Sequence, residues 1–534
     1  MSKIILRGDA ARFALKKGID EVADSVKITL GPRGRNVVLQ RYNVPLITND
    51  GVSIAREIEV KDPIEQLGVD IVKEVANKAN DVAGDGTTTA IILTQAISEI
   101  GLGRTAFFCD KMAVRRGLEA SSELVVSRLK EMARPVKTLE EAVQVASISA
   151  ESEELGKVIG EVVMEVGKDG AVTVDESPAS GIFSEIVTGM KIDKGYLSHY
   201  MVTDNEKMVV EYPNVAVLVT DKRLSSVKDI FPFLDKVISG GQKELLIIAE
   251  DVEGEALAGM IVNKVRGIMN VVAIKAPGFG ERKKEIMEDI AIAVGGKVVS
   301  KSVGLDLATV EPNEVLGQIS RLVVTKDQTV MIRGSLSDDG AVQERIASIK
   351  KDMESVESKH DKEQMKSRIA MLNGVVAVIR VGANTEAEAK YLKLKVEDAV
   401  NATQAAIDEG IVTGGGSALV KVWEWLRVNR PGDLNSVEFQ SGVDILLESL
   451  LVPFKQIVEN AGRDDFAVLL LDLRKGDQGY DAKNDIVVED MFKAGIIDPV
   501  KVTRTALERA VSAAAILLTT EVAVAEVKKD DGHV

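Results

Sequence analysis

The chain has 534 residues, more than one hydrophobic core usually serves, so its length predicts about three domains. Its net charge of −16 argues against a nucleic-acid-binding protein, because contacts to phosphates need clustered Lys and Arg. The single cysteine, Cys109, excludes disulfides within the chain and a zinc site built on several thiolates. Aromatic residues make up only 4%, so the cores must consist of Val, Ile, Leu and Ala.

No segment indicates secretion or a membrane. The first residues lack the long apolar core of a secretory signal. The most apolar late stretch, 510–520, is 11 residues long, whereas a helix needs about 20 to span a bilayer. The three histidines lie far apart in the sequence, so a His-rich metal site is not indicated. We expect a soluble, cytoplasmic protein.

Helical patterns dominate the first part of the chain. Apolar residues recur at helical spacing through 13–26, 64–82 and 87–100. A strand-like run lies at 36–39.

The middle of the chain has a different pattern. Short β-branched runs at 215–220, 245–249 and 271–275 predict strands, and 254–267 predicts a helix between the last two. Strand, helix and strand in this order indicate a βαβ-type domain.

Helical patterns return towards the end. A charged helical stretch at 339–371 precedes a strand-like run at 375–381, and long helices follow residue 385. A helical start and a helical end thus flank an α/β middle, which predicts one domain built from both ends with the others inserted into it. Residues near the changes in pattern are candidate hinges, namely Pro135, Gly189, Gly374 and Gly410.

The segment 83–89, Ala-Gly-Asp-Gly-Thr-Thr-Thr, is the most informative one. It follows one helical pattern and opens the next, so its hydroxyls and the free N–H groups of a helix start suit phosphate oxygens. Asp85 between the glycines could hold Mg²⁺ against those phosphates. An ordinary helix N-cap explains the segment equally well. The chain has no G-x-x-x-x-G-K-[ST] motif, so a common P-loop is not expected.

Three other turns could approach a nucleotide, and each has a simpler explanation. The turn 29–34 could be a helix stop, 48–51 a β-turn, and 413–417 a site of tight helix packing. Asp398 lies in a helical pattern, and nothing nearby in the sequence makes it catalytic.

Taken together, these segments closely resemble the group I chaperonins, the GroEL and mitochondrial heat-shock chaperonin type. The matching stretches follow the family's order over nearly the whole chain: 29–39, 50–57, 83–89, 247–257, 275–280 and 396–399. The resemblance implies an α/β multidomain fold. A mainly helical equatorial domain would comprise 1–133 and 409–534, a small intermediate domain 134–189 and 376–408, and an α/β apical domain 190–375.

The resemblance also implies an ATPase that uses Mg²⁺ and K⁺. Asp398 would orient or deprotonate the attacking water with help from Asp50, and Asp85 would hold Mg²⁺. The other implied nucleotide contacts are Thr29, Leu30, Gly31, Pro32, Asn49, Gly51, Gly84, Gly86, Thr87, Thr88, Thr89, Gly414, Gly415, Asp481, Ala482 and Asp498.

In the apical domain the resemblance implies an apolar surface for non-native proteins. Leu257, Ile261 and Val262 share one face of the predicted helix, although such stripes are more often domain core. The full implied set is Tyr196, Tyr200, Phe231, Leu234, Leu257, Ile261 and Val262. The implied partners are further copies of the chain in a double heptameric ring, a small co-chaperonin lid and non-native client proteins, with neither nucleic acid nor membrane.

Three features depart from the family pattern. Asn49 stands in place of a common Lys, Asp481 replaces a frequent Asn, and the tail 528–534 lacks the usual Gly-Gly-Met repeats. The resemblance implies an ATP-dependent chaperone that promotes folding inside a ring cavity. A non-folding paralogue that acts as a protein-binding scaffold is one alternative, and a small-molecule kinase or ligase is another.

Overall fold

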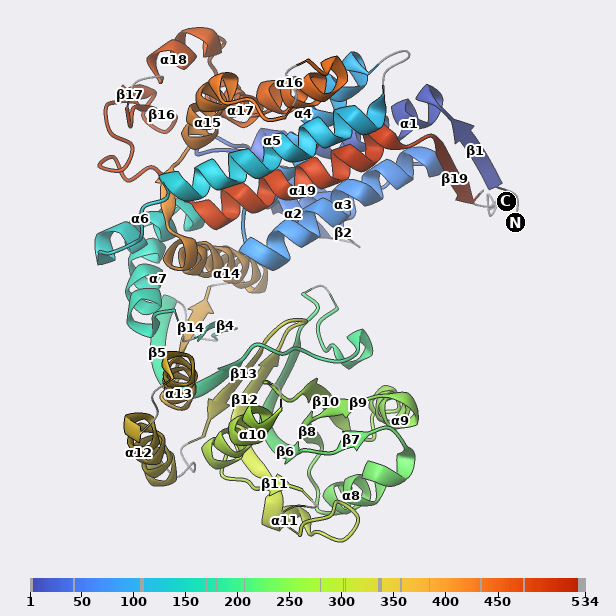
Figure 1. Cartoon of the computed structure of the whole chain (residues 1–534), viewed down its shortest axis with the longest axis vertical. Helices are drawn as coiled ribbons and strands as arrows, with labels where there is room; N and C mark the ends of the chain where they lie inside the picture. The colour runs from blue at the N-terminus through green and yellow to red at the C-terminus, as the bar shows by residue number, and fades with distance from the viewer. Residues whose placement is uncertain are drawn as a thin grey trace. The chain divides into compact units, whose positions relative to one another are not determined.

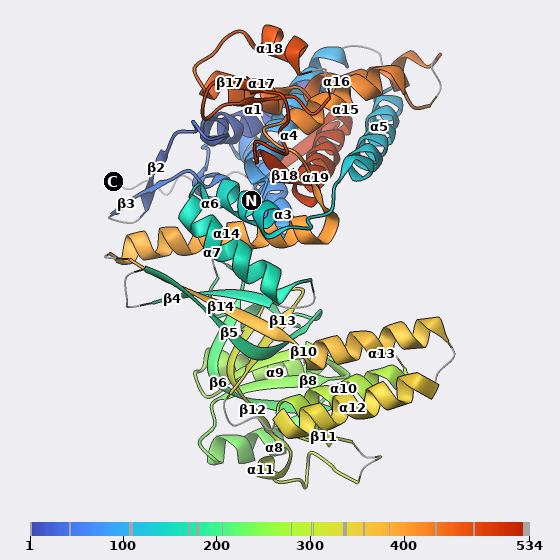
Figure 2. The same ribbon diagram turned by 90° about the vertical axis from the view of Figure 1, so that its left-hand side faces the viewer.

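The computed structural model describes residues 3–526 except 42–43, 106–109, 169–170, 178–180, 206, 279, 301, 303, 335–338, 356–357, 384, 433–434 and 474–475. Cys109 and the tail 528–534 therefore lie outside the described residues. The chain divides into two compact units (Figures 1 and 2). The helical unit comprises Met1–Glu165, Glu176–Ile182 and Val381–Val534, and the sheet unit comprises Val166–Asp175 and Phe183–Arg380.

Long helices form the centre of the helical unit. Helix α19 (Val500–Thr519) packs against α3 (Pro63–Ala83), α4 (Thr87–Arg104) and α5 (Lys111–Met132), as Figure 1 shows. Helix α4 has buried residues on all sides, as expected of a helix inside a bundle. Helix α1 (Asp9–Val26) packs on α3 and buries Ile19, Val22 and Val26 in the same core. The predicted helices at 13–26, 64–82 and 87–100 are therefore confirmed as α1, α3 and α4.

The helical unit contains further helices. They are α2 (Gly51–Glu57), α6 (Leu139–Ala150), α7 (Glu153–Val166), α14 (Glu386–Glu409), α15 (Ser417–Val428), α16 (Val437–Ser449), α17 (Val452–Asn460) and α18 (Phe466–Asp472). The strands of this unit form two-stranded antiparallel pairs: β1 (Lys3–Arg7) with β19 (Val522–Glu526), β2 (Val37–Arg41) with β3 (Val44–Thr48), β15 (Ile411–Thr413) with β18 (Ile497–Pro499), and β16 (Gly479–Asp481) with β17 (Ile486–Val488). Strand β2 contains most of the run predicted at 36–39.

The sheet unit is built on a mixed sheet. Strand β8 (Glu244–Ala249) lies between β6 (Val210–Thr220) and β10 (Asn270–Lys275), parallel to both, and α9 (Gly254–Val265) connects β8 to β10. This arrangement confirms the βαβ prediction. The path of the sheet continues from β6 through β12 (Gly317–Val324), β13 (Thr329–Arg333), β5 (Gly181–Ile192), β14 (Val375–Gly382) and β4 (Ala171–Glu176). Short strands accompany it, namely β7 (Arg223–Leu224), β9 (Asp251–Val252) and β11 (Val298–Val299).

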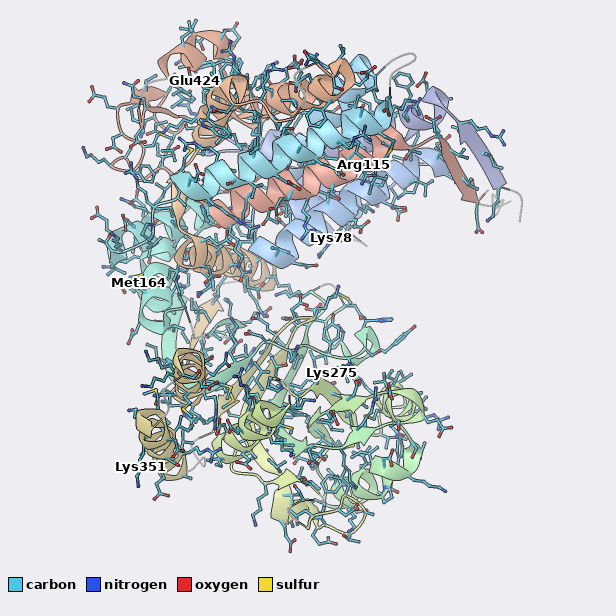
Figure 3. The ribbon with its side chains drawn as sticks, in the orientation of Figure 1. Lys78, Arg115, Met164, Lys275, Lys351 and Glu424 are labelled. Atoms are coloured by element: carbon cyan, nitrogen blue, oxygen red, sulfur yellow. The ribbon has the colours of Figure 1, made fainter. Side chains whose placement is uncertain are left out.

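A buried aspartate connects three helices of this unit through ion pairs. Asp289 of α10 (Glu281–Ala293) is 0% exposed and accepts hydrogen bonds from Arg345 of α12 (Asp339–Ser355) and Arg368 of α13 (Lys359–Leu372). The two Nε atoms lie 2.7 and 2.6 Å from the carboxylate. Figure 2 shows α12 and α13 as neighbours of α10, and Figure 3 shows Lys351, an exposed residue of α12. The charged stretch 339–371 thus contains two helices, and each forms an ion pair with Asp289 of α10.

Two further helices pack in the sheet unit, α8 (Val227–Ser239) and the short α11 (Pro312–Val315). No helix among the described residues is both long and apolar enough to cross a bilayer. The division into equatorial, intermediate and apical domains stays a prediction, as do the four candidate hinges.

Glycine allows two helices of the core to touch backbone to backbone. A Cβ on Gly68 of α3 would lie 2.0 Å from the carbonyl oxygen of Leu15, and one on Gly18 of α1 would lie 1.9 Å from that of Glu65. Both contacts are with backbone atoms, which cannot turn aside as a side chain can. Helices α1 and α3 therefore require glycine at this crossing.

We expect Gly68→Ala to lower the apparent midpoint of thermal unfolding, because an added methyl group in a packed core typically costs about 1–3 kcal/mol. Gly103→Ala is the matched control: it lies in helix α4, and its Cβ would meet nothing within 4 Å. That change should raise the midpoint slightly, since Ala favours a helix over Gly by about 1 kcal/mol. Calorimetry of both variants checks the pair, and equal shifts would contradict the packing argument.

Candidate functional site

A cavity of about 1110 Å³ lies in the helical unit. Its walls are turns and helix starts from separate stretches of the chain, together with one face of α14. Most of the nucleotide-contact residues implied by the resemblance line it: Thr29, Leu30, Gly31, Pro32, Asn49, Asp50, Gly51, Asp85, Gly86, Thr87, Thr88, Thr89, Asp398, Gly415, Asp481, Ala482 and Asp498.

Asp50 is fixed in place by its own helix. It is the N-cap of α2, and its carboxylate accepts the N–H groups of Val52 at 3.2 Å and Ser53 at 2.9 Å. The Asp50 N–H in turn donates to Thr48 Oγ at 3.1 Å. The turn 48–51 is therefore a helix cap that presents a carboxylate to the cavity, and not a plain β-turn.

The segment 83–89 forms the turn between α3 and α4. Gly84 and Gly86 both adopt the left-handed conformation, with φ of 69° and 82°. A Cβ on Gly84 would lie 2.0 Å from Cβ of Asn401 on α14, so the absence of a side chain here lets α14 pack closely. Gly84 does not line the cavity, and its expected contact with phosphates is not supported.

The first turn of α4 faces the cavity without a side-chain cap. The N-cap residue is Gly86, which has no side chain, and the hydroxyl-bearing Thr87–Thr89 line the cavity. The N-cap explanation of this segment is therefore wrong for α4. Uncapped N–H groups at a helix start attract anions, because they carry the positive end of the helix dipole.

Three carboxylates belong to this part of the cavity, on Asp50, Asp85 and Asp398. Asp85 accepts hydrogen bonds from the Gly86 N–H and, at 3.1 Å, from the Ser149 hydroxyl. Burial raises the pKa of Asp85, and the Asp50 charge adds to the rise. Burial, followed by the charges of Asp50 and Asp85, raises the pKa of Asp398 well above its ordinary value. The charge of Lys395 lowers both pKa values but does not offset the effects of burial and of the neighbouring carboxylates.

Asp498 lies on another wall of the cavity. Pairing of β15 with β18 sets Val412 opposite Asp498, and the Gly414 N–H donates to the Ile496 carbonyl at 2.9 Å. The Gly415 N–H donates to the Asp498 carboxylate, yet burial raises the pKa of that carboxyl to about 7. Gly415 and its neighbour Gly416 line the cavity, whereas the predicted Gly414 does not, because it packs against the backbone before Asp498.

The turns at 29–32 and 479–484 complete the lining. Asn460 Nδ2 donates to the carbonyl oxygens of Lys27 and Leu30, at 2.9 Å each, and holds the first turn in place. The Asp481 carboxylate accepts the N–H groups of Lys483 at 2.9 Å and Asn484 at 3.1 Å. Asp481 thereby organises its own turn.

Sequence reasoning missed several residues of the site. Ser149 and Glu151 lie at the end of α6, and Lys395 lies on α14 one turn before Asp398; all three line the cavity. No local motif marks them, because each is identified only by the side chain it meets in the folded chain.

The apolar residues predicted to bind clients differ in exposure. Tyr200 is 60% exposed and Val262 is 46% exposed. Tyr196, Phe231, Leu257 and Ile261 are partly buried. Leu234 is only 2% exposed and belongs to the core of the sheet unit, so the expectation that it lies on the surface is wrong. Val265 and Ile268, which the resemblance does not select, are also exposed near Val262, at 75% and 43%.

Asp85 is the candidate side-chain ligand for a cation. Among the described residues, no three His, Cys, Asp or Glu side chains converge closely enough to hold a metal ion alone. Magnesium commonly binds through one or two carboxylates and completes its shell with substrate phosphates and water. Asp85, beside the uncapped start of α4, fits that pattern.

The raised pKa of Asp498 predicts a pH-dependent stability. The folded chain keeps this proton up to about pH 7, whereas an unfolded chain releases it near the ordinary value of 3.8. The free energy of unfolding must therefore fall as the pH rises between these values. Asp498→Asn, which has no charge, should raise the unfolding midpoint more at pH 8 than at pH 5, because at pH 5 only part of this loss has set in. Calorimetry at both values checks this, and an equal shift at both would contradict it.

Two kinds of comparison identify the fold. The chaperonin gp146 from the bacteriophage EL, crystallised in the presence of ATP-BeFx, has a similar structure, with a TM-score of 0.72 at 23% identity. The match covers 98% of this chain and 100% of that one. A second crystal form of the same phage protein gives a TM-score of 0.64. This likeness shows that the fold is the multidomain α/β fold of a chaperonin.

The sequence leads to the same family. The model of the TCP-1/cpn60 chaperonin family matches residues 22–528, nearly the whole chain. On this match, the chain belongs to the TCP-1/cpn60 chaperonin family.

Proposed function

We propose that this chain is an ATP-hydrolysing chaperonin of the group I type, which binds non-native proteins and promotes their folding inside an oligomeric ring. One observation carries the proposal: Asp50, Asp85 and Asp398, from three separate stretches of chain, line one cavity beside an uncapped helix start. The phage chaperonin of similar structure was crystallised with an ATP analogue, which supports a nucleotide as the ligand.

The lining of the cavity offers groups that would contact each part of a magnesium-bound ATP. The start of α4 and the hydroxyls of Thr87–Thr89 would take the phosphates, and Asp85 would hold Mg²⁺, which neutralises phosphate charge when bound. Asp498 and Gly415 would lie against the sugar, and Asp481 and Ala482 against the base. The carbonyl oxygen of Asn49 would contribute to a K⁺ site, a role that does not depend on the side chain present there.

Asp398 is the candidate general base. Its raised pKa means that the buried carboxylate holds a proton strongly, as a group that must take one from water should. Positive charge brought in with the nucleotide would favour the ionised form, which is the form that can act as a base. Asp50, held by the start of α2, would help to align the water.

The sheet unit would bind client proteins. Tyr200, Val262, Val265 and Ile268 expose apolar surface. Such a surface binds non-native chains because burying apolar area is favourable whatever the sequence. A double heptameric ring and a small co-chaperonin lid belong to this proposal through the resemblance to group I chaperonins.

A non-folding paralogue that acts as a scaffold is the second candidate. It would retain the apolar surface and have no need for the carboxylates. Their joint presence in one cavity favours the ATPase.

We expect Asp398→Ala to bind ATP and to lose most turnover, by about 100-fold or more, because general bases contribute that much. The measurements are ATP affinity and phosphate release with Mg²⁺ and K⁺ present, alongside the refolding yield of an aggregation-prone client with and without a lid protein. Glu388→Gln, which removes an exposed carboxylate from the same helix, is the control and should behave like the wild type. Normal turnover in Asp398→Ala would remove Asp398 from the mechanism.

We expect Val262→Ser to weaken the capture of a denatured client several-fold with unchanged ATP turnover, because it removes apolar area from the binding surface. Val428→Ser is the matched control, since Val428 is 85% exposed and belongs to the helical unit, whereas Val262 belongs to the sheet unit. Client capture can be measured by light scattering of the aggregating client. Equal losses of client capture in both variants would indicate nonspecific hydrophobic binding and not a defined binding surface.

A further inference from the structure

Glu151 joins two segments that carry the candidate catalytic carboxylates. Asn49 Nδ2 donates to both oxygens of the Glu151 carboxylate, at 3.0 and 3.3 Å. Lys395 Nζ forms an ion pair with the same carboxylate at 2.7 Å. Asn49 precedes Asp50 in the chain, and Lys395 lies one turn before Asp398 on α14. One carboxylate thus ties the segment of Asp50 to the helix of Asp398.

The backbone at Glu151 points to a role beyond folding. Glu151 follows α6 in the left-handed conformation, with φ of 52°, which is unusual for a residue other than Gly, Asn or Asp. A strained position is retained when the side chain there does something that a relaxed residue cannot. Glu151 brings a charge that Asn or Gly would lack.

Lys395 explains why the charge matters. Its side chain is only 13% exposed and lines the cavity, and its positive charge acts on both Asp85 and Asp398. Without Glu151, this flexible ammonium group would be free to pair with Asp85 or Asp398, on which its charge already acts. An ion pair between Lys395 and Asp398 would occupy the group that has to receive a proton.

We infer that Glu151 is a positioning residue of the ATPase: it holds Asn49 and Lys395 so that Asp50 and Asp398 keep their places and Asp398 stays free to act. The inference rests on the proposed function. Ser149, on the same turn of α6, donates to Asp85 at 3.1 Å, so the end of this helix supports all three carboxylates. Glu151 acts through its neighbours and does not itself have to touch ATP.

Glu151→Asn gives the sharpest test, because a structural role and a positioning role predict opposite results. Asn tolerates the left-handed conformation, so the variant should unfold at the same or a higher temperature than the wild type. It loses the ion pair with Lys395, so single-turnover phosphate release should fall about 10- to 100-fold. The dissociation constant for ATP should change less than about threefold, because binding and turnover are separable.

Glu151→Gln and Lys395→Met complete the experiment. Glu151→Gln keeps an acceptor for Asn49 and loses the charge, so turnover should again fall at an unchanged midpoint. The double variant Glu151→Gln/Lys395→Met should lose no more turnover than Lys395→Met alone, because the effects of substitutions at two interacting residues are not additive. Glu140→Gln, an exposed carboxylate in the first turn of α6, is the control and should match the wild type.

Three results would overturn the inference: wild-type turnover in Glu151→Asn, a loss of turnover that parallels a lower unfolding midpoint, or additive losses in the double variant. The proposed function fails separately. If wild-type protein is shown to be assembled and releases no phosphate from ATP, the proposed ATPase activity is refuted. If the wild type releases phosphate from ATP and Glu151→Asn is equally active, only the role of Glu151 is refuted.

Discussion

The gathering of Asp50, Asp85 and Asp398 around one cavity is the constraint on which the rest of the helical unit depends. Buried like charges repel, and burial alone already disfavours their ionised forms. The fold offsets this with local supports: a helix start for Asp50, a hydroxyl and a backbone N–H for Asp85, and the charge of Lys395 beside Asp398. Under the proposed function, a cation that enters together with the phosphates would offset the remaining repulsion between these carboxylates.

Close helix packing makes this gathering possible. Gly84 lets Asn401 of α14 approach the turn that carries Asp85, and Gly18 and Gly68 let α1 and α3 touch through their backbones. A side chain at any of these positions would move a helix that carries or supports part of the site. Gly84 and Gly414, both predicted as ligand contacts, therefore serve packing, while the first turn of α4 has no side-chain cap.

The sequence alone determined much of the fold. Helical periodicity located α1, α3 and α4, and β-branched runs located β6, β8 and β10 with the βαβ connection of the last two. These features follow from local patterns of apolar residues, which depend only on the spacing along the chain. The order of motifs implied the chaperonin family, which the family match confirmed, and the structural likeness confirmed the fold.

The sequence determined only part of the candidate site. The turns that carry Asp50 and Asp85 were visible because they combine glycine with polar residues. Asp398 stands in an ordinary helical pattern, and only packing of α14 brings it to the cavity. Likewise, Leu234 could not be separated from the exposed Val262, because both fit an apolar helix face and burial depends on what packs against that face. Glu151 shows the limit most clearly: its partners lie 102 and 244 residues away in sequence, at Asn49 and Lys395, and only the folded chain brings them together.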